Sequence, residues 1–365
     1  MKKILLVGSL IFVLLAVTAC SNAEAVNHKY ASDAVSPEKE WVFVEEEIED
    51  EEIVDLGPRS FLTGLPIDED DLYRRPFAVV LGNNRAAWPH SGISSADLIY
   101  EAPAEGGVTR LIAFFQSELP TQVGPVRSAR EHFIDYALNH DAVFVHHTSS
   151  QGAMNRLLYY GINRIDGGSL GGNVFWRDQS QPAWAGGGTR MLEHSSFMSP
   201  EHALIHMENI GMRALVENVE ELSFDFGSIP ASVTPLQSAE SVSIAYSTVY
   251  RRTFNFDAET NTYLVGNSDG PHMDALNQEP VTVTNILLQQ TWVRGTGAGD
   301  LALYVNTGRI RSQLITGGEV FTVYWERDWF GQPIRWFFEN GEPMILPPGR
   351  TWISTVTPEL PIHFN

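Results

Sequence analysis

The hydrophobic pattern of the chain changes once, near residue 236, and this change predicts two modules of different architecture. Residues 58–235 alternate short apolar runs with stretches of helical periodicity, which is typical of a mixed α/β domain. Beyond residue 236, apolar side chains recur at every second position, as at Val242, Ile244 and Tyr246. That spacing predicts antiparallel strands. We therefore expect an α+β protein in which a β-rich domain over residues 236–365 follows the mixed α/β domain.

Local patterns predict the individual elements of the first module. Four apolar runs are predicted strands: residues 77–81, 96–100, 108–115 and 142–145. The second and third of these are separated by a Gly-Gly turn, so we expect them to form a hairpin. Three stretches are predicted helices: residues 128–139, 152–160 and 201–214. Ser128 and Glu131 have the spacing of a capping box, and Ser199 followed by Pro200 is typical of a helix start.

The first twenty residues predict export and attachment to a membrane by lipid. Lys2 and Lys3 precede an apolar run of about 14 residues, which is shorter than the roughly 20 residues of a membrane span. The only cysteine, Cys20, ends a Val-Thr-Ala-Cys run that resembles a bacterial lipobox. We therefore expect a lipoprotein signal peptide over residues 1–19 and cleavage before Cys20. Acyl chains such as palmitate on Cys20 would then hold the protein at the outer face of the cytoplasmic membrane.

Residues 20–57 are predicted to form an acidic, disordered tether. Between residues 38 and 55 there are ten acidic side chains and one lysine, and such a run repels itself and stays extended. Over the whole chain, 24 basic and 45 acidic side chains give a formal net charge of −21. No nucleic-acid partner is therefore expected, and contact with the membrane should come from the acyl chains. The single cysteine also excludes an intrachain disulfide framework.

Motifs in both modules carry a resemblance to a known family. In the first module they are residues 62–65, 75–78, 96–101, 104–110 and 124–130, and in the second 272–274, 285–286 and 346–352. Together they resemble the YerB-like bacterial lipoprotein family, which has a two-part domain of unknown function. The resemblance implies a surface lipoprotein, mainly of Gram-positive bacteria, with an α/β domain before a β-rich one and no established reaction. The His-His-Thr-Ser-Ser run at residues 146–150 departs from the small, glycine-rich turn of the family pattern.

Residues 101–135 hold the best candidate for a binding site. The candidate ligand-binding residues are Glu101, Glu105, Gly106, Gly107, Arg110, Arg127, Ser128, Arg130 and Asp135. A helix start attracts negative charge, so two arginines beside the predicted start at residue 128 work against the helix dipole. They fit there if carboxylates of the chain pair with them in a buried network, or if they face a carboxylate or phosphate of a ligand. Both alternatives stay open; a cell-wall polymer, a peptide or a phosphosugar would supply the anion.

Binding is the leading functional prediction, because the sequence has no complete catalytic motif. We expect an adaptor of the cell envelope that binds an anionic cell-wall ligand or a partner in cell-wall synthesis. One alternative is an envelope hydrolase of glycan or phosphoester bonds, with Glu101 and Glu105 as paired carboxylates. Another is a small-solute-binding lipoprotein with a pocket between the modules. His202 and His206 lack the glutamate of an HExxH motif, so neither a metal nor another cofactor is expected.

One loop of the second module stands apart from its many core aromatics. Trp329 and Phe330 lie at a predicted hairpin tip, within residues 326–331. A sheet does not by itself bury side chains at such a tip, so we expect these rings to be exposed. Exposed rings there would suit a sugar or a protein partner.

Overall fold

The computed structural model describes residues 57–180, 189–295, 301–303 and 308–365, with only the backbone at residues 293–294 and 301–303. The predicted signal peptide, Cys20 and almost all of the predicted tether lie outside these residues. Asp55–Asn365 forms one compact unit. Among the helices of the described residues, none has both the length and the apolar character needed to cross a membrane.

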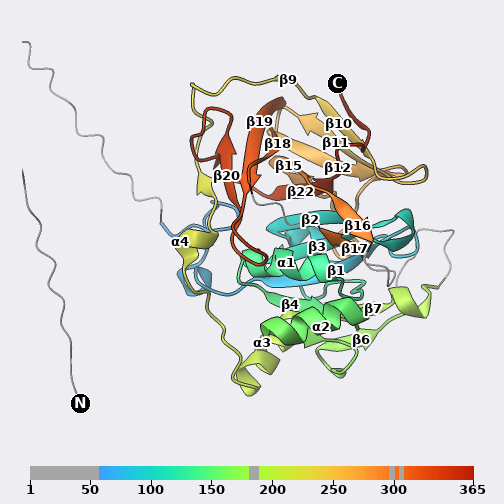
Figure 1. Cartoon of the computed structure of the whole chain (residues 1–365). Coiled ribbons are helices and arrows are strands. Elements are labelled where there is room, and N and C mark those ends of the chain that lie inside the picture. Colours follow the sequence, from blue (N-terminus) through green and yellow to red (C-terminus); the bar gives the residue numbers. More distant parts are fainter. Residues whose placement is uncertain (1–56, 181–188, 296–300, 304–307) are drawn as a thin grey trace, which may run out of the picture. The chain divides into compact units, whose positions relative to one another are not determined.

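A mixed sheet of eleven strands is the largest element of the described structure (Figure 1). Its path runs β20-β19-β18-β15-β22-β2-β3-β1-β4-β5, and β9 pairs with β19. The first-module strands are β1 (Phe77–Asn83), β2 (Leu98–Pro103), β3 (Thr109–Phe115), β4 (Val143–His146) and β5 (Arg164–Asp166). The others are β9 (Gln237–Ser238), β15 (Asn285–Gln290), β18 (Ile310–Thr316), β19 (Glu319–Glu326), β20 (Arg335–Phe338) and β22 (Thr351–Val356).

The two halves of this sheet meet between β2 and β22. These strands are parallel, and Leu98 lies opposite Thr351. Strands from both sides of residue 236 therefore share one sheet. The predicted hairpin within the first module is confirmed, because β2 and β3 pair antiparallel from Leu98 opposite Phe114 to Pro103 opposite Thr109.

A second sheet comes entirely from the region beyond residue 236. It contains β10 (Ser241–Ala245), β11 (Arg251–Asp257), β12 (Thr262–Asn267), β13 (Gly270–Pro271), β14 (Thr282–Val283) and β23 (Ile362–Phe364). Its pairs are antiparallel, as the two-residue periodicity predicts. Three two-stranded pairs complete the described strands: β6 (Phe175–Arg177) with β7 (Ser196–Met198), β8 (Asp225–Phe226) with β21 (Ile345–Leu346), and β16 (Val293–Gly295) with β17 (Leu301–Leu303).

The described α-helices all lie before residue 236. They are α1 (Glu131–Asn139), α2 (Gln151–Tyr160), α3 (Pro200–Asn209) and α4 (Val219–Leu222). Short 3-10 turns occur at η1 (Glu69–Asp71), η2 (Ile93–Ser95), η3 (Glu105–Gly107) and η4 (Leu192–His194). This combination of a mixed α/β region and a β-rich region confirms the α+β class. The third helix ends at Asn209, five residues before the predicted end.

Helix starts follow the predicted caps in one case and depart from them in another. The Ser199 side chain accepts from the N–H of His202 at the start of α3, as predicted. The predicted capping box at Ser128 is wrong, because α1 begins at Glu131 and has no side-chain cap. The Ser128 hydroxyl instead lies 2.9 Å from that of Thr148. The segment before α1 is held as an extended strip by its neighbours, so Ser128 stands too early to cap the helix.

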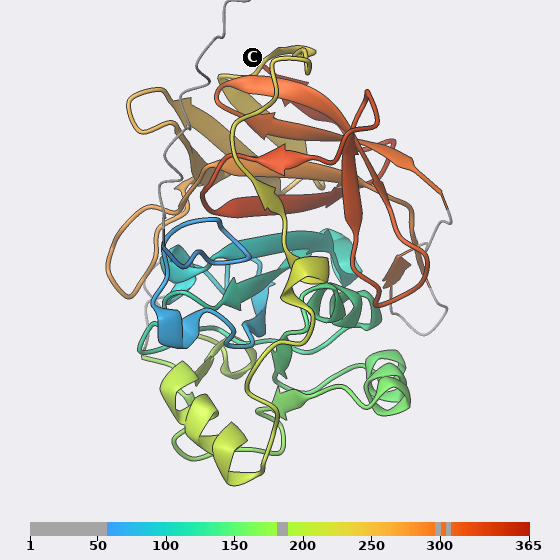
Figure 2. The ribbon, with the colours of Figure 1, turned by 90° about the vertical axis from the view of Figure 1, so that its left-hand side faces the viewer.

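Alternation along β1 shows how the central sheet is covered on both faces. Val79 and Leu81 belong to a core shared with β10–β12 and α3. Ala78 and Val80 belong to the opposite core, shared with α1 and α2. All seven residues of β1 are buried, since each face has its own cover. Along the order of the sheet, Figures 1 and 2 show the orange-to-red strands on the β22 side of β2, and α2 and α3 beyond β4 on the other side.

Candidate functional site

The carboxyl ends of three parallel strands mark the candidate site. β1, β4 and β5 are parallel neighbours, and they end at Asn83, His146 and Asp166. In open α/β sheets, ligands bind outside the carboxyl ends of parallel strands. The strip before α1 crosses this edge, because Val126 forms a bridge with Leu81 and Ala129 forms one with Ser149. Arg127 and Ser128 lie between these two anchoring points.

Arg127 is the centre of a group of arginines at this edge. Its guanidinium donates to the backbone carbonyl of Glu193. Burial lowers the pKa of Arg127, and the positive charges of Arg130 and Arg177 lower it further, against the opposing effect of Glu193. Arg127 is half-buried, and Arg177 is exposed. Three guanidinium groups therefore act on one another at a surface of the molecule that solvent reaches.

Glu105 is the carboxylate that balances Arg130 of this group and also Arg110. It forms an ion pair with Arg130, and its Oε2 lies 3.8 Å from Arg110 Nη2. Partial burial acts to raise the pKa of Glu105, but the hydrogen bond and charge of Arg130 outweigh it and the pKa is lowered. Arg110 also donates to the Ser128 carbonyl at 2.9 Å. The structure thus brings Glu105, Arg110, Ser128 and Arg130 together beside Arg127.

The turn at Glu105 explains the two predicted glycines. Gly106 has φ +76° and Gly107 has φ +72°, a region that is strained for residues with a Cβ. An added Cβ at Gly106 would meet no atom within 4 Å. These glycines are therefore required by the backbone conformation rather than by a close neighbour, and they place Glu105 next to the arginines.

His147 lies in the same group, and its hydrogen bonds fix its tautomer. Arg177 Nη2 is 2.7 Å from His147 Nε2, and Ser196 Oγ is 2.9 Å from Nδ1. Since a guanidinium only donates, Nε2 accepts and Nδ1 carries the proton that it donates to Ser196. Burial lowers the pKa of His147, and the charge of Arg177 lowers it further. In this arrangement His147 cannot take a proton from Ser196, so the two do not form a nucleophile–base pair.

Thr148 has a strained backbone at the same edge. Its φ is +64°, which is unusual for a β-branched residue. Asp166 Oδ1 accepts from the N–H groups of Thr148 at 2.9 Å and Gly168 at 2.8 Å. The Thr148 carbonyl lies 2.7 Å from His146 Nδ1. These contacts hold the turn at residues 146–150, and the His147 N–H donates to the Arg127 carbonyl at 3.0 Å.

Glu101, by contrast, lies away from solvent in a saturated network. Its side chain has 0% exposure and is paired with Arg252, whose Nε lies 2.7 Å from Oε2. Oε1 accepts from Tyr250 at 2.6 Å, Thr109 at 2.7 Å and Asn83 at 2.9 Å. A carboxylate with these partners has no free face for a ligand. For Glu101 the geometry therefore favours a buried ion-pair network over a ligand-binding site.

The Glu101 network continues through two neutral histidines. Arg252 Nη1 donates to His272 Nδ1 at 3.2 Å, so Nε2 of His272 carries a proton and donates to His90 Nδ1 at 2.8 Å. His90 Nε2 then donates to the Gly82 carbonyl at 2.5 Å. Burial lowers the pKa of His90 to about 3 and that of His272 well below its usual value. This chain of donors ties β11 to the end of β1.

Asp135 is also enclosed, on the opposite side of the sheet from the six-stranded sheet. It forms an ion pair with Arg327, and Oδ1 accepts from the Gly331 N–H at 2.7 Å. Both charged side chains are almost fully buried. The nine predicted residues therefore separate into a surface group around Arg127 and two buried carboxylates, Glu101 and Asp135.

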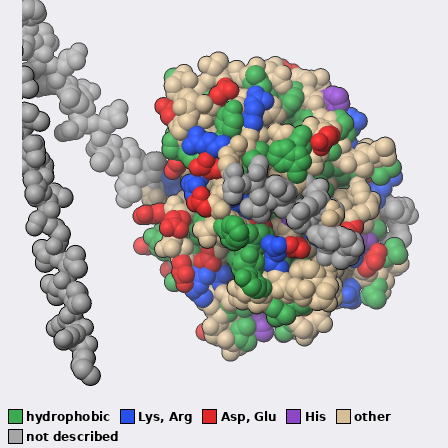
Figure 3. All heavy atoms as spheres, in the orientation of Figure 1, with side chains coloured by type: hydrophobic (Ala, Val, Ile, Leu, Met, Phe, Trp, Pro, Cys, Tyr) green, Lys and Arg blue, Asp and Glu red, His purple; other side chains and the backbone are tan. Residues whose placement is uncertain are grey.

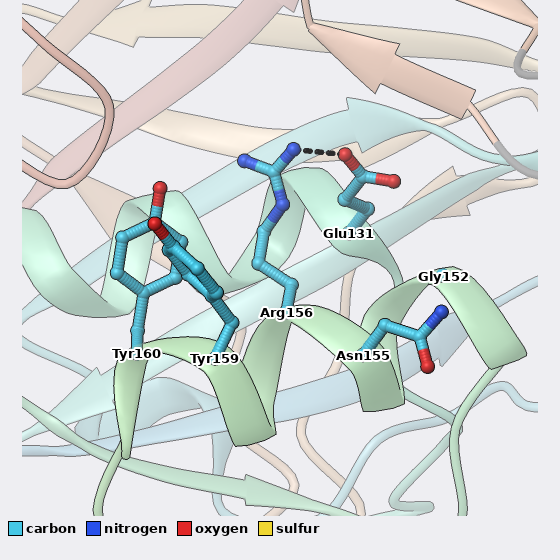
Figure 4. A pocket seen from close by; sticks show the side chains of 6 residues that line it. All are labelled: Glu131, Gly152, Asn155, Arg156, Tyr159 and Tyr160. Carbon is cyan, nitrogen blue, oxygen red and sulfur yellow. Dashed lines mark hydrogen bonds and ion pairs between the residues drawn. The ribbon is translucent and has the colours of Figure 1, made fainter.

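Sequence reasoning missed a hollow along α2, next to the start of α1 (Figure 4). It has a volume of about 420 Å³ and is lined by Glu131, Gly152, Asn155, Arg156, Tyr159 and Tyr160. Arg156 pairs with Glu131, and its guanidinium carbon lies 4.0 Å from the ring centroid of Phe330. Tyr159 is 82% exposed. The available signal was the spacing 152, 155, 156, 159 and 160, which places these residues on one helix face.

The predicted exposure of the aromatic loop is partly confirmed. Trp329 is 66% exposed, whereas Phe330 is half-buried and stacks on Tyr160 with ring centroids 5.2 Å apart. In the described part of the chain, no three His, Cys, Asp or Glu side chains are grouped in a way that could hold a metal ion.

Comparison with known proteins places this architecture in a family. The N-terminal domain of a protein of unknown function (DUF3048) matches residues 62–211, and its C-terminal domain matches residues 242–353. A protein of Bacillus subtilis (strain 168) named "Putative lipoprotein YerB" is 31% identical over 303 residues, covering 81% of this chain and 85% of the relative. The crystal structure of YerB from Bacillus subtilis has a TM-score of 0.72 at 28% identity, covering 84% of this chain and 99% of that one. The resemblance to YerB-like proteins is thus confirmed, and the chain belongs to the DUF3048 family.

Proposed function

We propose that this chain is a lipid-anchored binding protein of the bacterial cell envelope, which holds an anionic group at the arginines around Arg127. Attachment through Cys20 is supported by the lipobox-like run and by the lipoprotein name of the Bacillus subtilis relative. The anchored protein would face the cell wall from the outer side of the cytoplasmic membrane. The ligand would be an anionic group of a cell-wall polymer or of a partner protein.

The observation that carries the proposal is the grouping of Arg127, Arg130 and Arg177 at the strand ends. Burial is the main cause of the lowered pKa of Arg127, and the charges of Arg130 and Arg177 add to it; an arriving anion would offset both effects. Guanidinium groups match carboxylate and phosphate oxygens with paired N–H donors. The hydroxyls of Ser128 and Thr148 are hydrogen-bonded to each other at 2.9 Å, which leaves one O–H to donate to a ligand at the same place. The formal net charge of the chain is −21, so a local group of arginines is unusual in it and supports a specific role for that group.

The start of α1 supports the same ligand chemistry. α1 has nine residues and no side-chain cap at its start, which is the end of a helix where an anion is favoured. Arg130 stands at the cap position and is drawn toward Glu105. A bound anion between Arg127 and Arg130 would meet two guanidinium groups and the positive end of the helix dipole.

The hydrolase alternative has less support from the geometry. Glycan hydrolysis by paired carboxylates needs one acid with a raised pKa and a second carboxylate facing the same bond. Glu101 is enclosed and paired, and the pKa of Glu105 is lowered, which favours its ionised form. Small-solute capture between the modules also has less support, because the Glu101 network fills part of their junction.

A sedimentation assay on isolated Gram-positive cell walls tests the proposal. The parent protein is compared with Arg127→Ala/Arg177→Ala and with Arg251→Ala/Arg350→Ala, a control that removes the same charge elsewhere. We expect the site variant to lose at least tenfold in affinity and the control to bind like the parent. Walls stripped of phosphodiester polymers by acid distinguish phosphate from carboxylate ligands. Equal binding by the parent and the folded site variant would contradict the proposal.

A further inference from the structure

A second hollow lies far along the chain from the arginine group, between α4 and β20. We call it the α4 groove and define it by the apolar floor of Phe224, Trp336 and Met344 and the acidic rim of Glu220, Glu221 and Asp225. Its volume is about 500 Å³. We propose that the α4 groove binds a basic, apolar peptide segment of a partner protein. This inference is independent of the anion site proposed above.

The floor of the groove offers aromatic faces at different depths. Trp336 is 7% exposed, whereas Phe224 is half-buried and reaches the surface. Phe337 follows Trp336 on β20, so its side chain points to the other face of the strand, where the guanidinium carbon of Arg309 lies 4.0 Å from its ring centroid. An aromatic floor of this kind binds both aliphatic stems and cationic heads of lysine or arginine.

The rim supplies negative charge above this floor. Glu220, Glu221 and Asp225 are exposed, and none of them forms an ion pair with another described residue. Arg335, which also lines the groove, is engaged by Asp328 at 3.0 Å and by Glu326 at 3.4 Å. In Figure 3, acidic side chains gather on the side of the molecule where Figure 1 shows α4. The groove therefore has an excess of negative charge that a basic segment complements.

Charge also decides against the chain's own tether as the occupant. The tether contains an apolar run, Trp-Val-Phe-Val at residues 41–44, that could enter an apolar hollow. Ten acidic side chains and one lysine surround that run between residues 38 and 55. Placing it beside Glu220, Glu221 and Asp225 would bring like charges together. A partner segment that carries lysine or arginine meets no such penalty.

The occupant must be recognised through its side chains, because the neighbouring strand edge is already covered. Residues 342–344 run along β20: the Phe338 N–H donates to the Glu342 carbonyl at 2.8 Å, and the Met344 N–H donates to the Trp336 carbonyl at 3.0 Å. Pro343, between them, has no N–H to offer to an additional strand. Specificity therefore depends on the floor and the rim.

Selection from a bead library of random decapeptides tests this proposal. The full chain is compared with Glu220→Gln/Glu221→Gln and with Glu201→Gln/Glu208→Gln, which neutralises the same number of charges on α3. We expect peptides that combine lysine or arginine with leucine, proline or aromatic residues to be retained at least fivefold better by the parent and the control than by the groove variant. No such difference, or no enrichment of basic residues, would overturn the proposal.

Two further measurements locate the binding and identify its charge dependence. Acetylating the lysines of a selected peptide keeps their stems and removes their charge, so we expect at least a tenfold loss of affinity. Hydrogen exchange should slow in residues 220–225 and 333–344 when the unmodified peptide binds. Protection elsewhere would overturn the proposal. So would faster exchange of the groove after deletion of residues 38–55, because it would identify the tether as the occupant.

Discussion

At the scale of single residues, the buried pair of Glu101 and Arg252 has the clearest energetic consequence. Both side chains have 0% exposure. Removing one partner of such a pair leaves an uncompensated buried charge, at a cost of about 3–5 kcal/mol, whereas replacing both can cost much less. We therefore expect Arg252→Met to lower the free energy of unfolding by that amount, and Glu101→Gln/Arg252→Met to recover part of it. Urea unfolding measures both; equal losses in the single and double variants would contradict the expectation.

The two histidines of the same network predict a pH dependence of stability. Burial lowers the pKa of His90 to about 3 and that of His272 well below its usual value, while both titrate near 6.5 in the unfolded chain. The folded state thus binds fewer protons than the unfolded state below pH 6.5. The contribution of the two neutral histidines to the free energy of unfolding is complete above that pH. It decreases as the pH falls, by up to about 1.4 kcal/mol per pH unit for each histidine.

Urea unfolding between pH 7.5 and 5 measures this slope. His90→Gln keeps a donor and an acceptor but cannot titrate, so its stability should decrease less steeply with falling pH than that of the parent. His363→Gln, at an exposed residue, is the matched control and should keep the parental slope. An unchanged slope in His90→Gln would show that the histidine pair is not the source.

The residues of the site were predictable where their partners are close in sequence. Glu105, Arg110 and Arg130 lie within 26 positions of one another, and a hairpin followed by a helix brings them together. Glu101 and Asp135 pair with Arg252 and Arg327, which lie 151 and 192 positions further along the chain. No local sequence pattern predicts an ion-pair partner so far along the chain. The sequence therefore shows that these residues are charged, but not that they are buried.

At the scale of elements, α1 and α2 form a matched comparison of helix starts. The Ser150 side chain accepts from the Ala153 N–H at 3.2 Å, whereas Ser128 lies outside α1 and caps nothing. Ser150→Ala should therefore lower the free energy of unfolding by about 1 kcal/mol, and Ser128→Ala by less than about 0.5 kcal/mol. Thermal unfolding of the two variants measures the difference. Equal losses would mean that Ser128 stabilises the α1 start in another way.

Elements with a strong periodic signal were predictable, and their ends were less so. The strands at β1, β2 and β3 and the alternating strands of the second sheet follow directly from apolar spacing. The start of α1 could not be predicted from its local sequence, because the bridge between Ala129 and Ser149 holds the preceding residues in an extended conformation. A contact between distant segments thus overrides a local capping signal.

At the scale of the whole molecule, the shared central sheet predicts cooperative unfolding. β2 and β22 pair in the middle of that sheet, and the Glu101 network crosses between β2 and β11. Separating the two parts would expose both strand edges and break that network. We therefore expect one unfolding transition in urea, with coincident tryptophan fluorescence and far-ultraviolet circular dichroism. Two separate transitions would contradict this.

The sequence alone could predict two kinds of secondary-structure pattern, but not how they join. The change of periodicity near residue 236 correctly predicts the mixed α/β part and the β-rich part. It contains no information on the parallel pairing of Leu98 with Thr351, since both strands are apolar runs that fit many neighbours. Long-range pairing is decided by the packing of whole layers rather than by any one segment.

The covering of β20 by residues 342–344 has a consequence for many copies held close together. A bare terminal strand offers its backbone groups to an identical neighbour, and crowding makes that exchange more frequent. Here the outermost backbone segment beside β20 contains Pro343, which has no N–H and so interrupts the hydrogen bonds that a strand of a second molecule would need. Dense populations of this protein should accordingly resist joining into continuous fibres at that end of the sheet.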